Sequence, residues 1–196
     1  MALVPRLEAT IVKSLRRFSS AVRADYRAVQ GAAAKYNGKE LSDRRLPIDA
    51  VQRIGFQMMI VIRTMRLARD LHLPLIPQLI SRIIRHLYAA EIHWNTDIAE
   101  GVSLVHGTGL VLSHSARIGE RCILFQGVTL GESIDPVTRM VGAPTLENDV
   151  HVGPGAVLLG PITVGSGSKI MANVVLTASV PPKSVVRAPD PEVVTR

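Results

Sequence analysis

Two residues that can transfer a proton stand at the start of the most regular part of this chain. Glu91 begins the segment Glu-Ile-His, and His106 begins the segment His-Gly-Thr-Gly fifteen residues later. A histidine titrates near neutral pH, so it can remove the proton of a hydroxyl group as that group attacks a carbonyl. A carboxylate bonded to the imidazole fixes its tautomer. The pair predicts general-base chemistry on a hydroxyl group.

The sequence after Glu91 repeats with a period of six. Branched apolar residues occupy positions 92, 98, 104 and 110, then 112, 118, 124 and 130 after a slip of two, and again every sixth position from 146 to 176. This period fits neither an α-helix nor one strand, but it fits a solenoid with short flat sides and tight corners. We expect the branched side chains to point inward. A loop at 131–144 interrupts the repeat.

The first half of the chain has helical spacing instead. Apolar residues recur every four positions from Leu7 to Leu15, and Gly38 breaks the pattern. Pro47 opens a second helix that ends near Asp70, and a third helix follows Pro74. The sequence therefore predicts an α+β protein. We expect a helical oligomerisation domain over 1–90, a β-helix catalytic domain over 91–186 and a tail over 187–196.

Composition narrows the class of protein. Apolar residues make up 47% of the chain and aromatic residues only 4%, which predicts an aliphatic core. The single cysteine, Cys122, excludes an internal disulfide, and its inward repeat position favours a core residue over a nucleophile. The N-terminus lacks the pattern of a signal peptide, and no apolar stretch is long enough to span a bilayer. We expect a cytoplasmic protein without membrane contact.

Positive charge gathers in the helical half. Residues 1–90 contain 16 Lys or Arg and 6 Asp or Glu, whereas residues 91–196 contain 7 and 10. Such asymmetry can indicate nucleic acid, an anionic membrane or an acidic substrate. Here the arginines alternate with apolar residues at helical spacing, as between Ile54 and Met65, which favours a solvated helix face. Because no nucleic-acid motif accompanies the charge, we expect no nucleic-acid partner.

The motifs of the second half resemble those of the serine acetyltransferases, hexapeptide-repeat enzymes with a left-handed parallel β-helix. The resemblance spans residues 70–186 and includes Glu-Ile-His, His-Gly-Thr-Gly-Leu-Val-Leu, Leu-Phe-Gln-Gly-Val-Thr-Leu-Gly and Val-Gly-Pro-Gly. It implies an acetyl-CoA-dependent O-acetyltransferase in which His106 is the general base and Glu91 stabilises the imidazolium. It also implies a homotrimer or a dimer of trimers, with sites between subunits and no metal.

The same resemblance implies where acetyl-CoA binds. The pantetheine arm would contact Gly131, Ser133, Gly153 and Pro154, and the adenylate and phosphates would lie near Lys169, Ala172 and Lys183. Many relatives have alanine where this chain has Pro154. Proline cannot donate an amide hydrogen, so this contact is altered.

The acceptor side departs from the family pattern. Val105 replaces an aspartate, Gly142-Ala143 replaces Arg-His, and Ser113-His114-Ser115 replaces Gly-Glu-Thr. Each lost charge-assisted hydrogen bond costs about 1.5–3 kcal/mol, so we expect weak binding of a zwitterion. We therefore predict a hydroxyl acceptor other than free serine, such as a sugar in a polysaccharide precursor or a specialised metabolite. L-Serine is the alternative.

Other classes remain open at this stage. A metal-dependent hexapeptide enzyme would use His93, His106 and His114 as zinc ligands, although their spacing does not obviously converge. A non-catalytic scaffold would explain the altered acceptor residues but not the presence of both Glu91 and His106. Family members that dock on a sulfhydrylase typically end in isoleucine. This chain ends in Arg196, so we expect no such complex.

Overall fold

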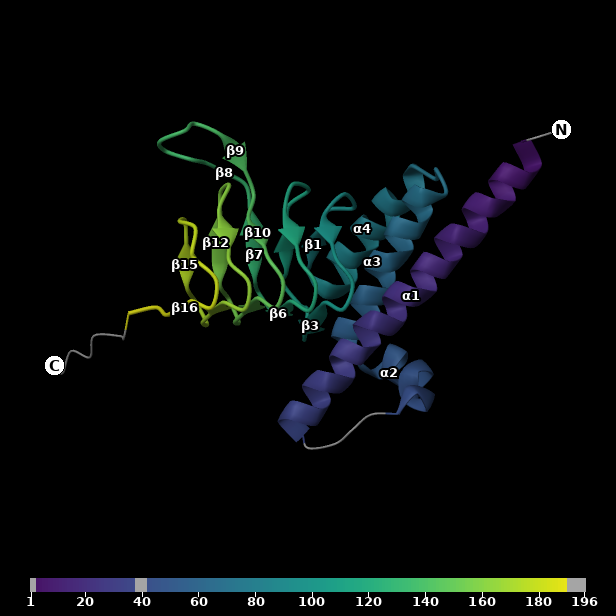
Figure 1. The fold of residues 1–196 in the computed structure, drawn as a ribbon, viewed down its shortest axis with the longest axis horizontal. Coiled ribbons are helices and arrows are strands. Elements are labelled where there is room, and N and C mark those ends of the chain that lie inside the picture. The colour runs from purple at the N-terminus through teal and green to yellow at the C-terminus, as the bar shows by residue number, and fades with distance from the viewer. Residues whose placement is uncertain (1–2, 38–41, 190–196) are drawn as a thin grey trace.

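The computed structural model describes residues 3–37 and 42–189, in which helices precede a solenoid (Figure 1). The helical elements are α1 (Leu3–Asn37), the 3-10 helix η1 (Asp43–Arg45), α2 (Leu46–Gln52), α3 (Ile54–Asp70) and α4 (Leu75–Tyr88). The helices lie at one end of the solenoid, and the C-terminal strand lies at the other (Figure 1). The predicted α+β fold class is confirmed. Gly38, where we expected a break, lies outside the described residues.

The coils of the solenoid contribute short strands to three parallel sheets. Sheet A contains β1 (Glu91–Ile92), β4 (Val111–Leu112), β7 (Thr129–Gly131), β12 (Val157–Leu159) and β15 (Val175–Leu176). Sheet B contains β2 (Asp97–Ile98), β5 (Arg117–Ile118), β10 (Thr145–Leu146) and β13 (Thr163–Val164). Sheet C contains β3 (Ser103–Val105), β6 (Ile123–Phe125), β11 (His151–Val152), β14 (Lys169–Ile170) and β16 (Val185–Val186). The antiparallel hairpin of β8 (Ser133–Ile134) and β9 (Val141–Gly142) projects from the stack between β7 and β10 (Figure 1).

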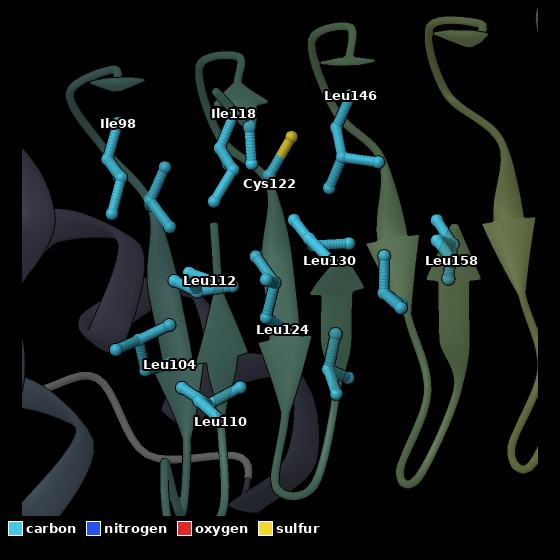
Figure 2. Close-up of a cluster of buried hydrophobic side chains, with 14 of the residues drawn as sticks. Ile98, Leu104, Leu110, Leu112, Ile118, Cys122, Leu124, Leu130, Leu146 and Leu158 are labelled. Carbon is cyan, nitrogen blue, oxygen red and sulfur yellow. The ribbon is translucent and has the colours of Figure 1, made fainter. Parts of the chain in front are cut away.

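The residues of the six-residue repeat fill the interior of the solenoid, as predicted. Repeat residues of successive coils stack on one another, as Ile92 does on Leu112 and Leu112 on Leu130. Figure 2 shows these aliphatic side chains converging between the sheets. The solenoid is therefore held by burial of one branched side chain per strand, with parallel strand pairing satisfying the backbone.

Cys122 has the inward position that we predicted and is fully buried. Burial raises the pKa of its thiol to about 11, so at pH 8 only about one thiol in a thousand is ionised. Since the thiolate is the reactive form, we expect no labelling of the native protein by 5,5′-dithiobis(2-nitrobenzoate) at pH 8, and one equivalent after unfolding in guanidinium chloride. Rapid labelling of the native protein would contradict this expectation.

The second predicted helix, from Pro47 to Asp70, is divided in the structure. Arg53 has an extended backbone that separates α2 from α3, and its side chain bonds Asp49. Just after this break, α3 packs on the first coil of the solenoid. A Cβ at Gly55 would lie 1.8 Å from the carbonyl oxygen of Leu104, so α3 meets strand β3 at its glycine. This contact spans elements far apart in the sequence, and local spacing did not predict it.

Arg63 is also a correction, because we expected the arginines of α3 to lie on a solvated face. Its side chain is buried and forms two hydrogen bonds with the carboxylate of Asp25 in α1, 2.8 and 2.9 Å long. It also donates to the carbonyl oxygens of Ile98 and Ala99 in the first coil. Met58 and other α3 residues join the solenoid in one hydrophobic cluster.

The predicted domain boundaries stay a prediction.

None of the helices in the described part of the chain combines the length and the apolar character needed to cross a bilayer.

Candidate functional site

The corner that joins sheet C to sheet A is longer in the first coil than in the second. Five residues separate Val105 from Val111, whereas three separate their partners, Phe125 and Thr129. The slip of two positions in the repeat is this insertion. His106 is the first residue of the longer corner, and its φ of 67° is unusual for a residue with a side chain. The insertion therefore presents His106 outside the regular wall of the solenoid.

Packing against the helices holds this corner. A Cβ at Gly107 would lie 2.4 Å from the sulfur of Met58 in α3, and the φ of Gly107 is 65°, so any other residue would be strained there and would displace Met58. The amide of Thr108 donates to the carbonyl oxygen of His106 over 2.9 Å, and that of Gly109 donates to Tyr88 at the end of α4. The Gly-Thr-Gly segment thus fixes the backbone, and the imidazole of His106 remains exposed.

Glu91 is the first residue of sheet A and points away from the core. Its register partner is Val111, so Glu91 lies one coil away from the far end of the His106 corner. Its carboxylate is 58% exposed and pairs with Arg85 of α4 over 2.6 Å. Within the part of the chain that the structure describes, no hydrogen bond joins Glu91 to His106. The assignment of Glu91 and His106 as a catalytic pair stays a prediction.

Gln126 is a candidate residue that we did not predict. The pairing of Val105 with Phe125 places Gln126 one coil away from His106, at the same corner. Its Oε1 is buried and has no donor among the described residues. Buried acceptors are nearly always paired, so this atom marks a place where a ligand or another subunit can supply a hydrogen bond. The only sequence signal was its place in the Leu-Phe-Gln-Gly motif.

A polar cluster lies at the opposite corner of sheet A, where the chain turns toward sheet B. Glu132 Oε1 accepts from Ser115 Oγ over 2.6 Å and from Ser113 Oγ over 3.1 Å, and it lies 3.1 Å from Nδ1 of His114. These bonds, first that of Ser115 and then that of Ser113, lower the pKa of Glu132 below its usual value. Glu132 is therefore an anion at neutral pH. We name these four residues the Glu132 cluster.

His93 makes local contacts within its own turn. Its Nδ1 accepts the amide hydrogen of Asn95, and its ring stacks on Trp94 at 3.9 Å between centroids. Partial burial, followed by the nearby His114, lowers its pKa. His93 and His114 are 5.4 Å apart between ring centroids, but His106 lies at the other corner. No trio of metal-ligating side chains exists within residues 3–37 and 42–189, so the zinc alternative has no ligand set there.

The residues predicted to bind acetyl-CoA fall into two groups on either side of sheet A. Gly131 and Ser133 flank Glu132 at the corner toward sheet B, beside the hairpin. Gly153, Pro154, Lys169 and Ala172 lie on sheet C or at the corner from sheet C to sheet A. Lys183 lies at the turn that leads from sheet B into β16 of sheet C. The structure does not bring the two groups together within one chain.

Two of the predicted coenzyme glycines pack closely against the next coil of the solenoid. A Cβ at Gly131 would lie 2.8 Å from the side chain of Leu159, and one at Gly153 would lie 2.8 Å from the amide nitrogen of Ala172. Lys169 is exposed on sheet C, where its ammonium group can meet phosphates. These residues would hold the coenzyme, whose assignment to them stays a prediction.

Sequence comparisons find relatives of this chain. Residues 143–178 match the family model described as bacterial transferase hexapeptide (six repeats). The chain is 35% identical to a serine acetyltransferase of Helicobacter pylori over 136 residues, which are 67% of this chain and 77% of that protein. It is 37% identical to one of Synechococcus elongatus over 127 residues, 65% of this chain and 51% of the relative. The chain spans about half the length of the first curated relatives that it matches.

Solved structures have the same fold. The serine acetyltransferase of Brucella abortus in complex with coenzyme A matches 94% of this chain and 70% of its own, with a TM-score of 0.76 and 26% identity. That of Neisseria gonorrhoeae in complex with serine matches 93% of this chain and 71% of its own, with a TM-score of 0.73 and 25% identity. With the coverage of the Helicobacter pylori relative, these matches establish that the chain belongs to the serine acetyltransferase family.

Proposed function

We propose that this protein is an acetyl-CoA-dependent O-acetyltransferase whose acceptor is L-serine. The observation that carries the proposal is His106, an exposed imidazole on a glycine-fixed corner that is longer than its counterpart in the next coil. The names of the relatives favour L-serine over the glycan that the altered acceptor residues had suggested.

In this proposal His106 moves one proton in two steps. The imidazole removes the proton from the acceptor hydroxyl as its oxygen bonds to the acetyl carbonyl carbon. As the carbon–sulfur bond breaks, the imidazolium returns that proton to the sulfur, so the products are an O-acetyl ester and a thiol. Glu91 would stabilise the imidazolium if its carboxylate left Arg85 and formed a hydrogen bond with His106.

A second candidate is a hydroxyl acceptor other than free serine, and Val105 is the observation that favours it. This apolar side chain is half-buried immediately before His106, and Ala143 is buried at the end of the hairpin. Neither offers a charge to an amino acid. The candidate retains the chemistry of His106 and changes only the acceptor.

Assembly as a homotrimer is part of the proposal, since the predicted coenzyme residues lie at two separate corners of one chain. The cytoplasmic location predicted from composition stays a prediction. A scaffold without catalysis would either bind no acetyl-CoA or bind acetyl-CoA without releasing thiol. Calorimetry of acetyl-CoA binding distinguishes these two forms of scaffold.

The experiment is to measure thiol release from acetyl-CoA with a panel of hydroxyl acceptors. We expect L-serine to give the highest kcat/KM, above homoserine, threonine and free sugars, with O-acetylserine identified by mass spectrometry. A higher kcat/KM with another hydroxyl acceptor would favour the second candidate. If acetyl-CoA binds but no acceptor in the panel causes thiol release, the result would favour the scaffold.

A further inference from the structure

The first turn of α3 contacts the chain on both sides of His106. Helix α3 packs beside strand β3, which leads into His106 (Figure 1). Before His106, the carbonyl oxygen of Leu104 lies so close to Gly55 that a Cβ there would collide with it. After His106, a Cβ at Gly107 would collide with the sulfur of Met58 and lie 3.4 Å from its Cε. Since Gly55 and Met58 are three residues apart, one face of α3 forms the wall behind His106.

The same turn of α3 is anchored to both neighbouring helices. Phe56 is buried, and its ring centroid lies 5.2 Å from that of Tyr26 in α1. Gln57 Oε1 accepts a hydrogen bond from the hydroxyl of Tyr88 over 3.0 Å. Tyr88 is the last residue of α4, and its carbonyl oxygen accepts the amide hydrogen of Gly109 near the end of the His106 corner. The turn is therefore held by α1, by α4 and by the solenoid.

The His106 corner needs support from outside the solenoid, because its inserted residues leave the regular pairing between coils. The corner is longer than its counterpart in the next coil. Its later part is held by the next coil, since the amide of Gly127 donates to the carbonyl oxygen of Thr108 over 2.9 Å. Within the described residues, no backbone hydrogen bond joins His106 or Gly107 to that coil. Packing on α3 takes the place of those bonds.

Met58 supplies this packing from a fixed place in the core. Its side chain is fully buried in the cluster that joins α3 to the solenoid. Protein interiors are close-packed, so its atoms cannot move away without strain elsewhere. Because Gly107 has no Cβ, the thioether of Met58 lies directly against the backbone of the corner. A shorter side chain at position 58 would leave a void behind Gly107, and His106 would shift with the backbone that moves into it.

We propose that Met58 is a positioning residue for the acetyl transfer, and that its side chain holds the His106 corner where the imidazole can reach the acceptor hydroxyl. The inference rests on the proposed function, because it takes His106 as the base. It goes beyond that function by assigning the helical half of the chain a part in catalysis. Through Met58, the position of α3 determines the position of His106.

The first test is the kinetics of Met58→Ala, measured with the panel acceptor that has the highest kcat/KM. We expect kcat to fall about 10- to 100-fold, since a displacement of about 1 Å in a reacting group has an effect of this order. The KM for acetyl-CoA should be unchanged. The residual rate should keep the pH dependence of the wild type, because the base is still present, whereas His106→Ala should lose it. Met58→Leu, which conserves the volume, should retain most of the activity.

Met65→Ala is the matched control. Met65 is an equally buried methionine of α3 in the same hydrophobic cluster, but it lies more than one turn further along the helix and does not contact Gly107. We expect a similar fall in the urea midpoint for the two alanine variants and a loss of kcat only in Met58→Ala. If Met58→Ala does not fold, Met58→Val and Met65→Val give the same comparison with a smaller truncation. An equal loss of kcat in the matched variants would overturn the inference.

The second test asks whether Met58 acts through its contact with Gly107. Gly107→Ala should lower kcat, because the new Cβ collides with Met58 and alanine is strained at a φ of 65°. Adding Met58→Ala removes the collision. The double variant should therefore have a higher kcat than Gly107→Ala, and its loss should be smaller than the product of the two single losses. A loss equal to that product would mean that the two sites act independently, and this would overturn the inference.

The outcomes separate this inference from the proposed function. If His106→Ala is as active as the wild type, both fail. If His106→Ala loses activity but Met58→Ala keeps the kcat of the wild type, the proposed function stands and the inference fails. A rise in the KM for acetyl-CoA without a fall in kcat would place the effect of Met58 on the coenzyme, and it would likewise overturn the inference.

Discussion

Replacing His106 with alanine is expected to lower kcat for acetyl transfer by about 10²- to 10⁴-fold, the usual contribution of a general base. The reason is that a neutral alkyl hydroxyl attacks a thioester slowly unless its proton is removed as the bond forms. The binding of acetyl-CoA should be unchanged, because His106 would act on the acceptor. Steady-state kinetics of thiol release and calorimetry of acetyl-CoA binding measure the two effects.

Two further variants exclude effects of the backbone. His106→Asn keeps a residue type that tolerates the positive φ of 67°, and it should lose as much activity as His106→Ala. His72→Ala is the matched control, since His72 is an exposed histidine with a φ of 57° at the turn before α4, away from both corners of sheet A. A rate in His106→Asn close to that of the wild type would remove His106 from catalysis.

The role of Glu91 can be separated from its ion pair with Arg85. If Glu91 orients His106, Glu91→Gln should lower kcat, while Arg85→Met should leave kcat unchanged or raise it, because the carboxylate is released. If Glu91 only joins α4 to the solenoid, the two variants should have the same small effect on stability and none on kcat. Kinetics together with urea unfolding distinguish these results.

Replacing Arg63 with methionine is expected to destabilise the protein by about 3–5 kcal/mol, because it leaves the carboxylate of Asp25 buried without its cation. Arg63 also donates to Ile98 and Ala99, and Asp25 accepts from the amide of Gly101. The pair therefore joins α1, α3 and the first coil of the solenoid. Urea unfolding at one fixed protein concentration measures the loss.

Arg17→Met is the matched control for this prediction. Arg17 and Asp70 also join α1 to α3, but they are 3.7 Å apart and the Arg17 side chain is half exposed. Removing such a pair should cost less than about 1 kcal/mol. The double variant Asp25→Leu with Arg63→Met should recover part of the loss, since it removes both buried charges. If Arg63→Met cost no more than Arg17→Met, Asp25 and Arg63 would not link the helices to the solenoid.

Periodicity made the solenoid predictable. In a β-helix the position of each side chain depends on its place in a short repeat, so Leu104 or Leu158 could be assigned to the interior without knowing any partner. The break in that periodicity was equally informative. The slip between Leu110 and Leu112 corresponds to the longer corner that carries His106.

The helical half was less predictable, because a helical period describes one element and not its neighbours. The sequence indicated one helix from Pro47 to Asp70, and it could not reveal that Gly55 must meet Leu104. The same spacing suggested that Arg63 faces water. Its burial depends on Asp25, which is 38 residues earlier in a different helix.

The sequence by itself determined the fold class, the inward residues and the residue types available for general-base chemistry, because each of these follows from local patterns. Only the tertiary structure decided which polar side chains meet. The length of a coil brings Ser113, His114 and Ser115 to Glu132, and the packing of α4 brings Arg85 to Glu91. Contacts of this kind depend on the exact rise and rotation of the chain between distant residues, which a spacing pattern does not contain.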